Sequence, residues 1–354
     1  MKKAVLIKNG DIRTKNFTMP KLLDSQCRIK VHTAGICSSD IYRSFGYGAY
    51  FYPLVLGHEI SGHVVECGKK VKKFFVNDAV SIFPLIPCKK CIFCMNKEYM
   101  RCNDYKYYGS RCEGGFAQFI DINEWNLVKI PNNIKLTDAA LLEPMAVCVH
   151  ALERLQLIKK NLDYSNKKVA VLGSGFLGLI ICDILRHHSP ELEIIAIDRN
   201  QAKLNIAKKN NVQTYLLNNN DENFKTKFRD YFTEVIEASG TSEGFKASLE
   251  ITKPGCRTLW MGNITTNLNL EKDLVSKILR KELQIMGTWN SIYRGKNQCD
   301  WDKSIDIMKS GYKPGNLISH VINLEQIGET IEKMFLHKER IKNFSSLKIV
   351  VKPN

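Results

Sequence analysis

The sequence predicts an α/β protein with two domains, a β-rich barrel-like domain and a doubly wound parallel sheet. Three observations lead to this prediction. The chain of 354 residues is long enough for two domains that each bury a core. Short β-like runs separated by turns fill the chain up to about residue 145. From about residue 146, apolar strand candidates alternate with helical segments.

The first domain is assigned to residues 1–145 and is expected to be completed by the tail, residues 290–354. Its strand candidates are CRIKVHTAG, SGHVVECG, DAVSIF and FAQFIDI. The tail contains a helical segment, DWDKSIDIMKS, and a final strand, SLKIVVKP. We expect this tail to return to the first domain.

The second domain is assigned to residues 146–289. Its apolar strand candidates are KKVAVL, LEIIAI, QTYLLN, TEVIEA, CRTLWMG and LQIMGTW, with helices such as FLGLIICDILRHH and QAKLNIAKKN between them. Alternation of this kind is typical of a doubly wound parallel sheet, here of about six strands.

The composition is that of an ordinary globular enzyme, with 44% hydrophobic and 25% charged residues. No apolar run reaches the roughly 18 residues of a membrane span, and the apolar stretch near the start is too short for a secretory signal. We therefore expect a cytoplasmic protein with no membrane partner. The net charge of +16 comes from lysines spread along the whole chain. Since no basic stripe alternates with aromatic residues, we expect no nucleic-acid partner, although the charge can attract anionic ligands.

Four cysteines, Cys88, Cys91, Cys94 and Cys102, follow the spacing C-x2-C-x2-C-x7-C within a lobe of about residues 84–105. Four thiolates at this spacing can close around one Zn²⁺ and leave no coordination position open, which predicts a structural zinc site. Iron–sulfur ligation is the alternative, but the x7 gap favours zinc over the x3 gap of the bacterial cluster motif.

A second set of metal-ligand residues precedes and follows this lobe. GICSSD contains Cys37, GHE contains His58 and Glu59, and EPMAVCVHA contains Glu143. Three protein ligands that leave one position for water or substrate make a catalytic zinc site. We therefore predict a second zinc ion, with Glu59 as a ligand in some states only and Glu143 acting either directly or through a metal-bound water.

The run GSGFLG, from Gly173 to Gly178, follows a predicted strand and opens a predicted helix. In this context Gly173 allows the tight turn, Gly175 the approach of a pyrophosphate and Gly178 close packing of helix and strand. Asp198 ends the next strand, where a carboxylate binds ribose hydroxyls and repels a 2′-phosphate, which favours NAD over NADP. Arg199 follows at once and leaves two alternatives open, contact with a phosphate or stacking on adenine.

The motifs GICSSD, GHEISG and GSGFLG, the cysteine lobe and the Glu-Pro pair at Glu143 together resemble the zinc-dependent medium-chain dehydrogenase family. The resemblance implies a GroES-like catalytic domain and a Rossmann NAD-binding domain, and Glu-Pro at Glu143 is typical of the polyol dehydrogenase branch. The runs YFYPLVLGHEISG, FPLIPCKKCIFC, YGSRCEGGFAQF and ILRKELQIMGTWNS are similar to those of its galactitol-phosphate and pentitol-phosphate dehydrogenases. Members usually form homodimers or homotetramers.

The resemblance also implies roles for three residues that follow Cys37. Ser39 matches the residue that passes the proton outward, and Asp40 supports the zinc site. Tyr42 stands where many alcohol dehydrogenases continue the proton relay with a histidine. Because an unperturbed tyrosine has a pKa near 10, this substitution puts the outer relay in question.

The implied activity is hydride transfer between NAD(H) and a secondary hydroxyl or ketone of a polyol or sugar phosphate. Guanidinium groups suit phosphate, so we predict that Arg43 and Arg111 bind it. Further substrate-facing candidates in the tail and just before it are Arg294, Lys296, Trp289 and Asn290.

Three alternatives remain. The substrate can be an unphosphorylated polyol or secondary alcohol, the enzyme can run as a reductase of a keto-sugar phosphate, or the chain can be a catalytically silent, zinc-stabilised binding protein. Metal analysis separates the last from the others, because two zinc ions per chain favour an enzyme.

Overall fold

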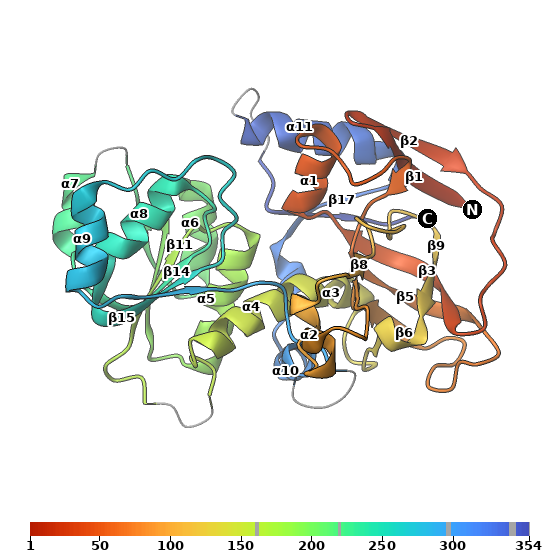
Figure 1. Ribbon diagram of the computed structural model, residues 1–354, viewed down its shortest axis with the longest axis horizontal. Coiled ribbons are helices and arrows are strands. Elements are labelled where there is room, and N and C mark those ends of the chain that lie inside the picture. Colours follow the sequence, from red (N-terminus) through yellow and green to blue (C-terminus); the bar gives the residue numbers. More distant parts are fainter. Residues whose placement is uncertain (160–162, 219–220, 295–298, 340–344, 354) are drawn as a thin grey trace. The chain divides into compact units, whose positions relative to one another are not determined.

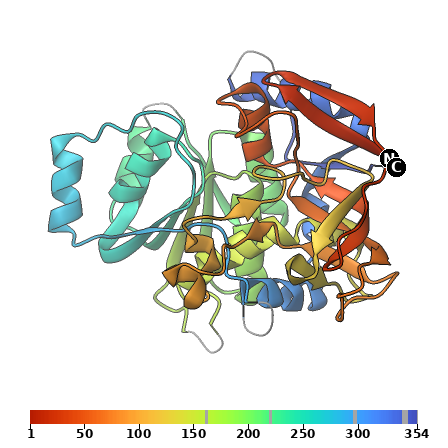
Figure 2. The same cartoon turned by 45° about the vertical axis from the view of Figure 1, so that its right-hand side comes forward.

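The computed structural model describes residues 1–159, 163–218, 221–294, 299–339 and 345–353 (Figure 1). The chain forms two compact units. The β unit consists of Met1–Ala146 and Ile292–Asn354, and the α/β unit consists of Val147–Ser291. Both ends of the chain lie on the β unit (Figures 1 and 2).

The β unit is built around a seven-stranded sheet in the order β10-β6-β5-β3-β18-β17, with β9 also paired to β3. Its strands are β3 (Gln26–Gly35), β5 (Glu59–Cys67), β6 (Ala79–Ile82), β9 (Phe119–Asn123), β10 (Leu127–Lys129), β17 (Ile318–Ile322) and β18 (Lys348–Val351). A second sheet has the order β2-β1-β4, made of β1 (Lys2–Lys8), β2 (Asp11–Asn16) and β4 (Leu54–Val55). A short ladder joins β7 (Leu85–Ile86) to β8 (Lys106–Tyr107).

Helices of the β unit include α1 (Ser38–Phe45), α2 (Ile92–Met95), α3 (Leu136–Ala140), α10 (Asp300–Lys309) and α11 (Ile327–Lys338). Single turns of 3-10 helix lie at Tyr99–Arg101, Glu124–Asn126, Pro314–Leu317 and Leu324–Gln326. Helix α4 (Leu142–Arg154) begins in the β unit and runs on into the α/β unit.

Strands β3 and β5 form the centre of the β unit. They run antiparallel, and their register opposes Gly35 to Glu59 at one end and Cys27 to Cys67 at the other. Ile29 and Ile60 on these strands are fully buried, since alternate residues of a strand share one face. Strand β18, near the end of the chain, pairs with β3 and therefore lies in the same sheet as β3 and β5.

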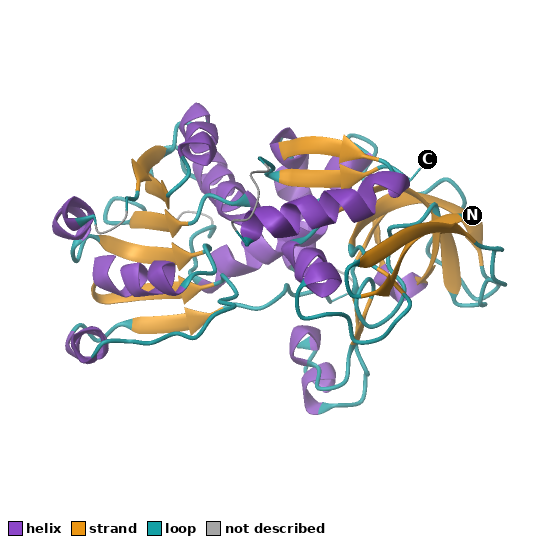
Figure 3. Ribbon diagram, turned by 90° about the horizontal axis from the view of Figure 1, so that it is seen from above, coloured by secondary structure: helices purple, strands orange, loops and turns teal. Residues whose placement is uncertain are grey.

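The α/β unit contains a six-stranded sheet in the order β13-β12-β11-β14-β15-β16, and all of its pairs are parallel (Figure 3). The strands are β11 (Lys168–Leu172), β12 (Glu193–Asp198), β13 (Gln213–Leu216), β14 (Phe232–Glu237), β15 (Thr252–Trp260) and β16 (Gln284–Gly287). The connecting helices are α5 (Phe176–His188), α6 (Gln201–Lys209), α7 (Glu222–Phe228), α8 (Ser242–Ile251) and α9 (Lys272–Arg280).

In chain order this sheet reads 3-2-1-4-5-6, the arrangement of a doubly wound dinucleotide-binding fold. The order reverses between β11 and β14, and ligands of such sheets bind beyond the carboxyl ends of the strands at that point. The predicted fold class is therefore confirmed. Within the described residues, no helix combines the length and the apolar character needed to cross a membrane.

Candidate metal centres and nucleotide site

The four cysteines of the lobe come together in the β unit. Their sulfur atoms all lie within 4.8 Å of one another, with 3.9 Å between Cys88 and Cys94 and 3.9 Å between Cys91 and Cys102. A tetrahedral zinc with Zn–S bonds of about 2.3 Å separates its sulfurs by about 3.8 Å, so this donor set fits zinc. Helix α2 and the 3-10 turn at Tyr99–Arg101 bring the four residues together.

Backbone amides favour the thiolate at one corner of this lobe. Hydrogen bonds from the backbone N–H groups of Asn103 and Cys94 lower the pKa of Cys91 to about 6. Burial instead raises the pKa of Cys94 to about 12. A cation among the four sulfurs would supply the charge that holds all four as thiolates.

A second group of ligand atoms comes from Cys37, His58 and Glu59, which lie within 4.8 Å of one another. Cys37 is the N-cap residue of α1, just after β3, while Glu59 is the first residue of β5. Because β3 and β5 are antiparallel partners, the end of one strand and the start of the other meet here. The fold thus assembles three of the four ligands predicted for a catalytic zinc.

Gly35 is a residue of this site that sequence reasoning missed. A Cβ atom at position 35 would lie 1.9 Å from Oε2 of Glu59, which real contacts never reach. Glycine is therefore needed to let the Glu59 carboxylate lie over β3. The paired register of the two strands, which reveals this, cannot be read from the sequence around GICSSD.

Asp40 lies beneath the group. Its Oδ2 accepts a 3.0 Å hydrogen bond from the Cys37 backbone N–H, and its Oδ1 is 3.5 Å from Nδ1 of His58. Burial opposes a charge on His58, but the neighbouring Asp40 carboxylate and Cys37 sulfur outweigh it and hold the pKa of His58 well above its ordinary value. Asp40 thus lies where it can orient the His58 ring.

Unsatisfied polar atoms gather at this point of the described chain. Oδ1 of Asp40 and Nδ1 of His58 are buried and form no hydrogen bond, although only 3.5 Å separates them. Oε2 of Glu59 also forms no hydrogen bond, and its neighbour is the charged Nζ atom of Lys348. Such atoms are costly unless something compensates them. One thiolate, one imidazole and carboxylates are the donor set of a zinc ion, so these residues fit the predicted metal.

Glu59 also has a buried cation beside it. The Nζ atom of Lys348 is 2.6 Å from Oε1 and 2.5 Å from Oε2 of Glu59, and it also donates to the carbonyl of Ile36. Lys348 opens β18, near the end of the chain. The sequence did not predict this contact, because nothing in SLKIVVKP indicates that its lysine is buried beside the metal group formed by Cys37, His58 and Glu59.

Glu143 lies on the first turn of α4 and is not among the three mutually close ligands. Its Oε1 accepts a 3.0 Å hydrogen bond from the hydroxyl of Tyr107, whose ring stands edge-on to His58 at 5.7 Å. Burial, with the Glu59 charge, raises the pKa of Glu143 to about 6. Tyr107 was also missed, since a tyrosine in a run of tyrosines carries no sequence signal.

Helix α1 carries the predicted relay residues. Ser39 is partly exposed in the first turn, one turn ahead of Arg43. Tyr42 stacks on Tyr47 at 6.3 Å and meets Phe335 edge-on at 6.2 Å. Burial raises the pKa of Tyr42, so it cannot act as a base near neutral pH.

The predicted phosphate-binding residues lie in one cluster. The guanidinium carbon of Arg111 is 4.6 Å from the ring centre of Tyr50, and that of Arg43 is 6.0 Å from the same ring. Among the weaker candidates, Arg294 is exposed, whereas Lys296 lies outside the described residues.

Trp289 and Asn290, in contrast, belong to the α/β unit. Trp289 is 63% exposed, and Asn290 has φ of 56° and accepts a hydrogen bond at Oδ1 from the backbone of Ser291. These contacts of Trp289 and Asn290 do not test the prediction that the two residues face the substrate.

The glycine-rich loop joins β11 to α5. Gly173 has φ of +96°, and a Cβ atom at Gly178 would lie 1.9 Å from the Gly173 carbonyl oxygen. A Cβ at Gly175 would meet nothing within 4 Å, and no side chain caps the helix that starts after it. The loop thus leaves open space beside a helix N-terminus that no side chain caps, which is the kind of position that suits a pyrophosphate.

Asp198 ends β12 next to this loop. Its Oδ2 accepts a 2.6 Å hydrogen bond from the Ser174 backbone, and its Oδ1 accepts one of 2.8 Å from Asn200. Each carboxylate oxygen keeps further lone pairs for a ribose hydroxyl. Arg199, the next residue, is exposed.

Glu237 is a buried carboxylate at the carboxyl end of β14 that sequence reasoning missed. Its Oε1 accepts hydrogen bonds from the backbone of Ser239 (2.8 Å) and Gly240 (3.1 Å), and its backbone carbonyl accepts from Gly262 (2.9 Å). A Cβ atom at Gly173 would lie 2.7 Å from Ser239. Glu237 therefore orders the loops after β14 and β15 against the glycine-rich loop.

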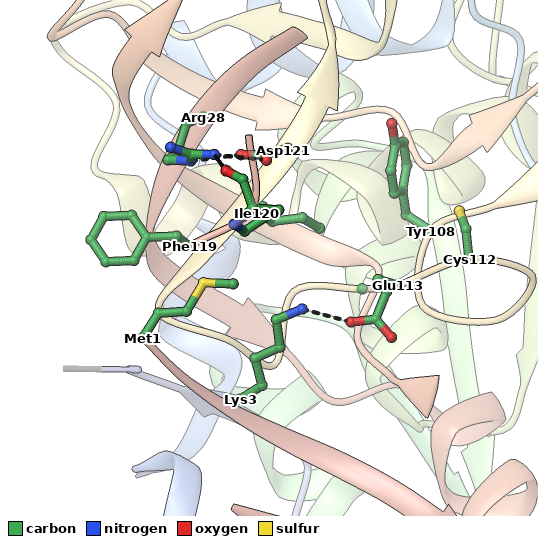
Figure 4. Close-up of a pocket in the computed structure, with 11 residues that line it drawn as sticks. Met1, Lys3, Arg28, Tyr108, Cys112, Glu113, Phe119, Ile120 and Asp121 are labelled. Carbon is green, nitrogen blue, oxygen red and sulfur yellow. Dashed lines mark hydrogen bonds and ion pairs between the residues drawn. The ribbon is translucent and has the colours of Figure 1, made fainter. Parts of the chain in front are cut away.

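A separate cavity of about 280 Å³ lies in the β unit, lined in part by Met1, Tyr108, Cys112 and Phe119 (Figure 4). Its charged residues pair with one another, Lys3 with Glu113 at 2.9 Å and Arg28 with Asp121 at 2.9 Å. None of the predicted site residues lines it.

Comparison with known proteins agrees with this geometry. Residues 24–132 match the family described as alcohol dehydrogenase GroES-like domain, and residues 177–310 match the family described as zinc-binding dehydrogenase. Together the two matches span more than half of the chain.

Named relatives extend over nearly the whole sequence. Galactitol 1-phosphate 5-dehydrogenase of Escherichia coli (strain K12) is 29% identical over 94% of this chain and 95% of its own length. Sorbitol dehydrogenase of Bacillus subtilis (strain 168) is 28% identical over 100% and 98%. The crystal structure of galactitol-1-phosphate dehydrogenase from Escherichia coli superimposes with a TM-score of 0.87 at 27% identity and covers 100% of both chains.

These matches confirm the resemblance drawn from the motifs. The chain belongs to the zinc-binding, medium-chain alcohol and polyol dehydrogenases, oxidoreductases that use zinc and a nicotinamide cofactor.

Proposed function

We propose that this enzyme oxidises a secondary hydroxyl of a polyol or sugar phosphate, of the galactitol-1-phosphate or pentitol-phosphate type, with NAD as hydride acceptor. The observation that carries the proposal is the group of Cys37, His58 and Glu59, with its unsatisfied buried atoms. Relatives that act on galactitol 1-phosphate and on D-arabitol phosphate support the substrate class.

In this proposal the chain holds two zinc ions. Cys88, Cys91, Cys94 and Cys102 hold one with no open position, which makes it structural. Cys37, His58 and Glu59 hold the other. Glu143 joins it directly or through water, which is supported by its hydrogen bond from Tyr107, the residue that stands edge-on to His58. When bound, the second ion would lower the pKa of a coordinated hydroxyl, and the nicotinamide would accept hydride.

The residues around this group then have distinct tasks. Asp40 orients His58 through its carboxylate. The Ser39 hydroxyl takes the proton that leaves the substrate and passes it outward. Tyr42 keeps its own proton near neutral pH, so the path beyond Ser39 uses water or the tyrosine hydroxyl as a neutral link.

The α/β unit supplies the cofactor site. Gly173, Gly175 and Gly178 shape the pyrophosphate loop, and Asp198 binds the ribose and disfavours a 2′-phosphate. Arg199 is left to stack on adenine. We assign residues 146–289 to cofactor binding and residues 1–145 with 290–354 to catalysis, in a cytoplasmic homodimer or homotetramer.

The test is NADH formation at 340 nm by zinc-loaded protein with galactitol 1-phosphate, ribitol 5-phosphate, galactitol, sorbitol and xylitol. A gain of more than about tenfold in kcat/KM from the phosphate group, or roughly 1.4 kcal/mol, supports a sugar-phosphate dehydrogenase. Equal turnover of free polyols would replace that substrate with an unphosphorylated one. No turnover of any polyol would overturn the proposed activity. The same assay with NADP checks the cofactor preference.

A further inference from the structure

Arg111 is held between two tyrosine rings in the β unit. Its guanidinium carbon lies 4.0 Å from the ring centre of Tyr105 and 4.6 Å from that of Tyr50. One of its terminal nitrogens also donates a 3.2 Å hydrogen bond to the Tyr50 hydroxyl. Contact with two rings, together with this hydrogen bond, restricts the orientations that the guanidinium group can adopt.

Arg43 approaches the same ring from α1. Its side chain is only 9% exposed, and the buried Nε atom has no hydrogen-bond partner. Its one hydrogen bond in the described chain is long, 3.5 Å from Nη1 to the carbonyl of Ser39. A buried guanidinium with an unsatisfied donor is costly unless a ligand completes it.

Neither arginine forms an ion pair within the described residues, although other arginines of low exposure do. Arg28 pairs with both Asp121 and Glu66, and Arg257 pairs with Glu234. Carboxylates thus compensate the charges of these two guanidinium groups. At the Tyr50 cluster no carboxylate of the described residues forms an ion pair with either guanidinium group, although the buried Asp40 carboxylate interacts electrostatically with Arg43. This arrangement points to an anion that is not part of the chain.

The cluster is continuous with the proposed catalytic metal group. The Tyr105 ring meets Tyr107 at 6.3 Å, and Tyr107 in turn meets His58 and donates to Glu143. From the other side, Arg43 reaches back to Ser39, two residues after Cys37. All of these residues belong to the β unit. A ligand that spans the metal group and the arginines would thus react at one end and be recognised at the other.

We propose that Tyr50 and Tyr105 position Arg111, together with Arg43, as a receptor for the phosphate group of a phosphorylated polyol. The proposal rests on the function proposed above and identifies the residues that select phosphorylated over free polyol. Two guanidinium groups match the charge of a phosphate monoester, which is close to −2 at neutral pH, and donate to several of its oxygens at once.

The same chemistry could receive the pyrophosphate of the dinucleotide. We commit to the substrate, because the cluster adjoins the metal group within one unit, whereas the glycine-rich loop already offers a pyrophosphate site in the other. Substitutions in the cluster distinguish the substrate phosphate from the dinucleotide pyrophosphate, because each ligand has its own KM. A cofactor receptor changes the KM for NAD, and a substrate receptor changes the KM for the polyol phosphate.

The experiment compares galactitol 1-phosphate with galactitol for the zinc-loaded full chain and its variants. Tyr105→Leu removes one stacking ring and should lower kcat/KM for the phosphorylated substrate by about tenfold, with less than about twofold change for galactitol. Tyr105→Phe keeps the ring and should stay within about twofold of wild type on both. Arg111→Ala should cost about tenfold to a hundredfold on the phosphorylated substrate alone, the range for charge-assisted hydrogen bonds. The KM for NAD should not change.

Two control variants test whether any surface change has the same effect. Phe51→Leu alters an exposed aromatic next to Tyr50, and Arg13→Ala removes an exposed arginine that pairs with Asp11. Both should leave the ratio of the two kcat/KM values unchanged. Equal losses on both substrates in Tyr105→Leu, or a rise in the KM for NAD with an unchanged ratio, would overturn the receptor.

A binding measurement tests the phosphate receptor even if the enzyme turns over no polyol. Inorganic phosphate is titrated calorimetrically into zinc-loaded protein with NAD present to fill the dinucleotide site. Wild type and Tyr105→Phe should bind it, while Arg111→Ala and Tyr105→Leu should bind at least about tenfold more weakly. Binding that is equal in all four proteins would refute the receptor. Inactivity towards every polyol with this binding pattern intact would refute the proposed activity and leave the anion receptor standing.

Discussion

Lys348 and Glu59 form a buried ion pair at the edge of the proposed catalytic metal group, with 2.6 Å from Nζ to Oε1. Their side chains are 4% and 1% exposed. The lysine neutralises a carboxylate that the fold would otherwise have to bury alone. A zinc ion bound to Cys37 and His58 would therefore compete with Lys348 for the carboxylate of Glu59.

Replacing Lys348 by methionine should destabilise the protein strongly, because it leaves the Glu59 carboxylate buried without its partner. Breaking a buried pair in this way costs about 3–5 kcal/mol. Guanidinium unfolding of the zinc-free protein measures the loss, because a bound zinc ion would itself act as a cationic partner of Glu59. Lys2→Met is the matched control, since Lys2 and Glu325 form a pair that is 47% and 48% exposed, and such pairs contribute at most about 1 kcal/mol. Similar losses in the free energy of unfolding of the two variants would show that the buried Lys348–Glu59 pair contributes no more than an exposed one.

Gly35→Ala should displace Glu59. The new Cβ atom would overlap the Glu59 carboxylate at 1.9 Å, and Lys348 restrains that carboxylate from behind. We expect metal analysis to find about one zinc per chain in place of two, together with loss of polyol oxidation. Gly287→Ala serves as the control, because a Cβ there meets nothing within 4 Å. A Gly35→Ala protein with two zinc ions and full activity would contradict the proposed ligand geometry.

The two metal groups should respond differently to loss of a thiolate. Cys94→Ser should remove one zinc and lower the melting temperature, because a structural zinc site contributes directly to folding. Cys37→Ser should also remove one zinc, but its main effect should be loss of activity. Zinc content, thermal melting and NADH formation are measured side by side. An active Cys37→Ser protein would exclude this residue as a catalytic ligand.

Glu237→Gln should weaken NAD binding by about threefold to tenfold. The change keeps the size of the side chain but replaces a carboxylate acceptor by a neutral one, and charge-assisted hydrogen bonds are about twice as strong. The loops at Ser239 and Gly240 should then hold their shape less firmly. Calorimetric titration with NAD gives the affinity without any turnover. Glu271→Gln, in an exposed pair with Lys246, should not alter it, and an unchanged affinity in Glu237→Gln would remove the positioning role.

Local patterns of the sequence predicted much of this molecule. The helix FLGLIICDILRHH and the glycine motif before it give α5 and its loop, because both depend on residues close together in the chain. The short spacing of the four cysteines likewise predicts a group that α2 and one 3-10 turn suffice to assemble. Strand boundaries were less certain, and β15 begins at Thr252, four residues before the predicted strand.

Residues whose importance depends on distant partners could not be predicted. Lys348 is separated from Glu59 by 289 positions, and Tyr107 is separated from Glu143 by 36. Gly35 matters only because the register of β3 opposes it to Glu59. For Arg43 and Arg111 the residue type suggested phosphate, but only the structure places both beside Tyr50. Tertiary pairing, which local sequence does not encode, determines each of these relationships.

The position of β18 between β3 and β17 has a kinetic consequence. The α/β unit is one continuous segment, whereas the β unit must join strands that begin at residues 26 and 348. Contacts of such long range form slowly, since the intervening chain loses much entropy when the loop closes. Refolding should therefore order the nucleotide loop well before Lys348 reaches Glu59. A metal ion added early in refolding would then meet Cys37 and His58 before Lys348 has completed the surroundings of Glu59, so the stage at which metal is added should affect which ion is bound.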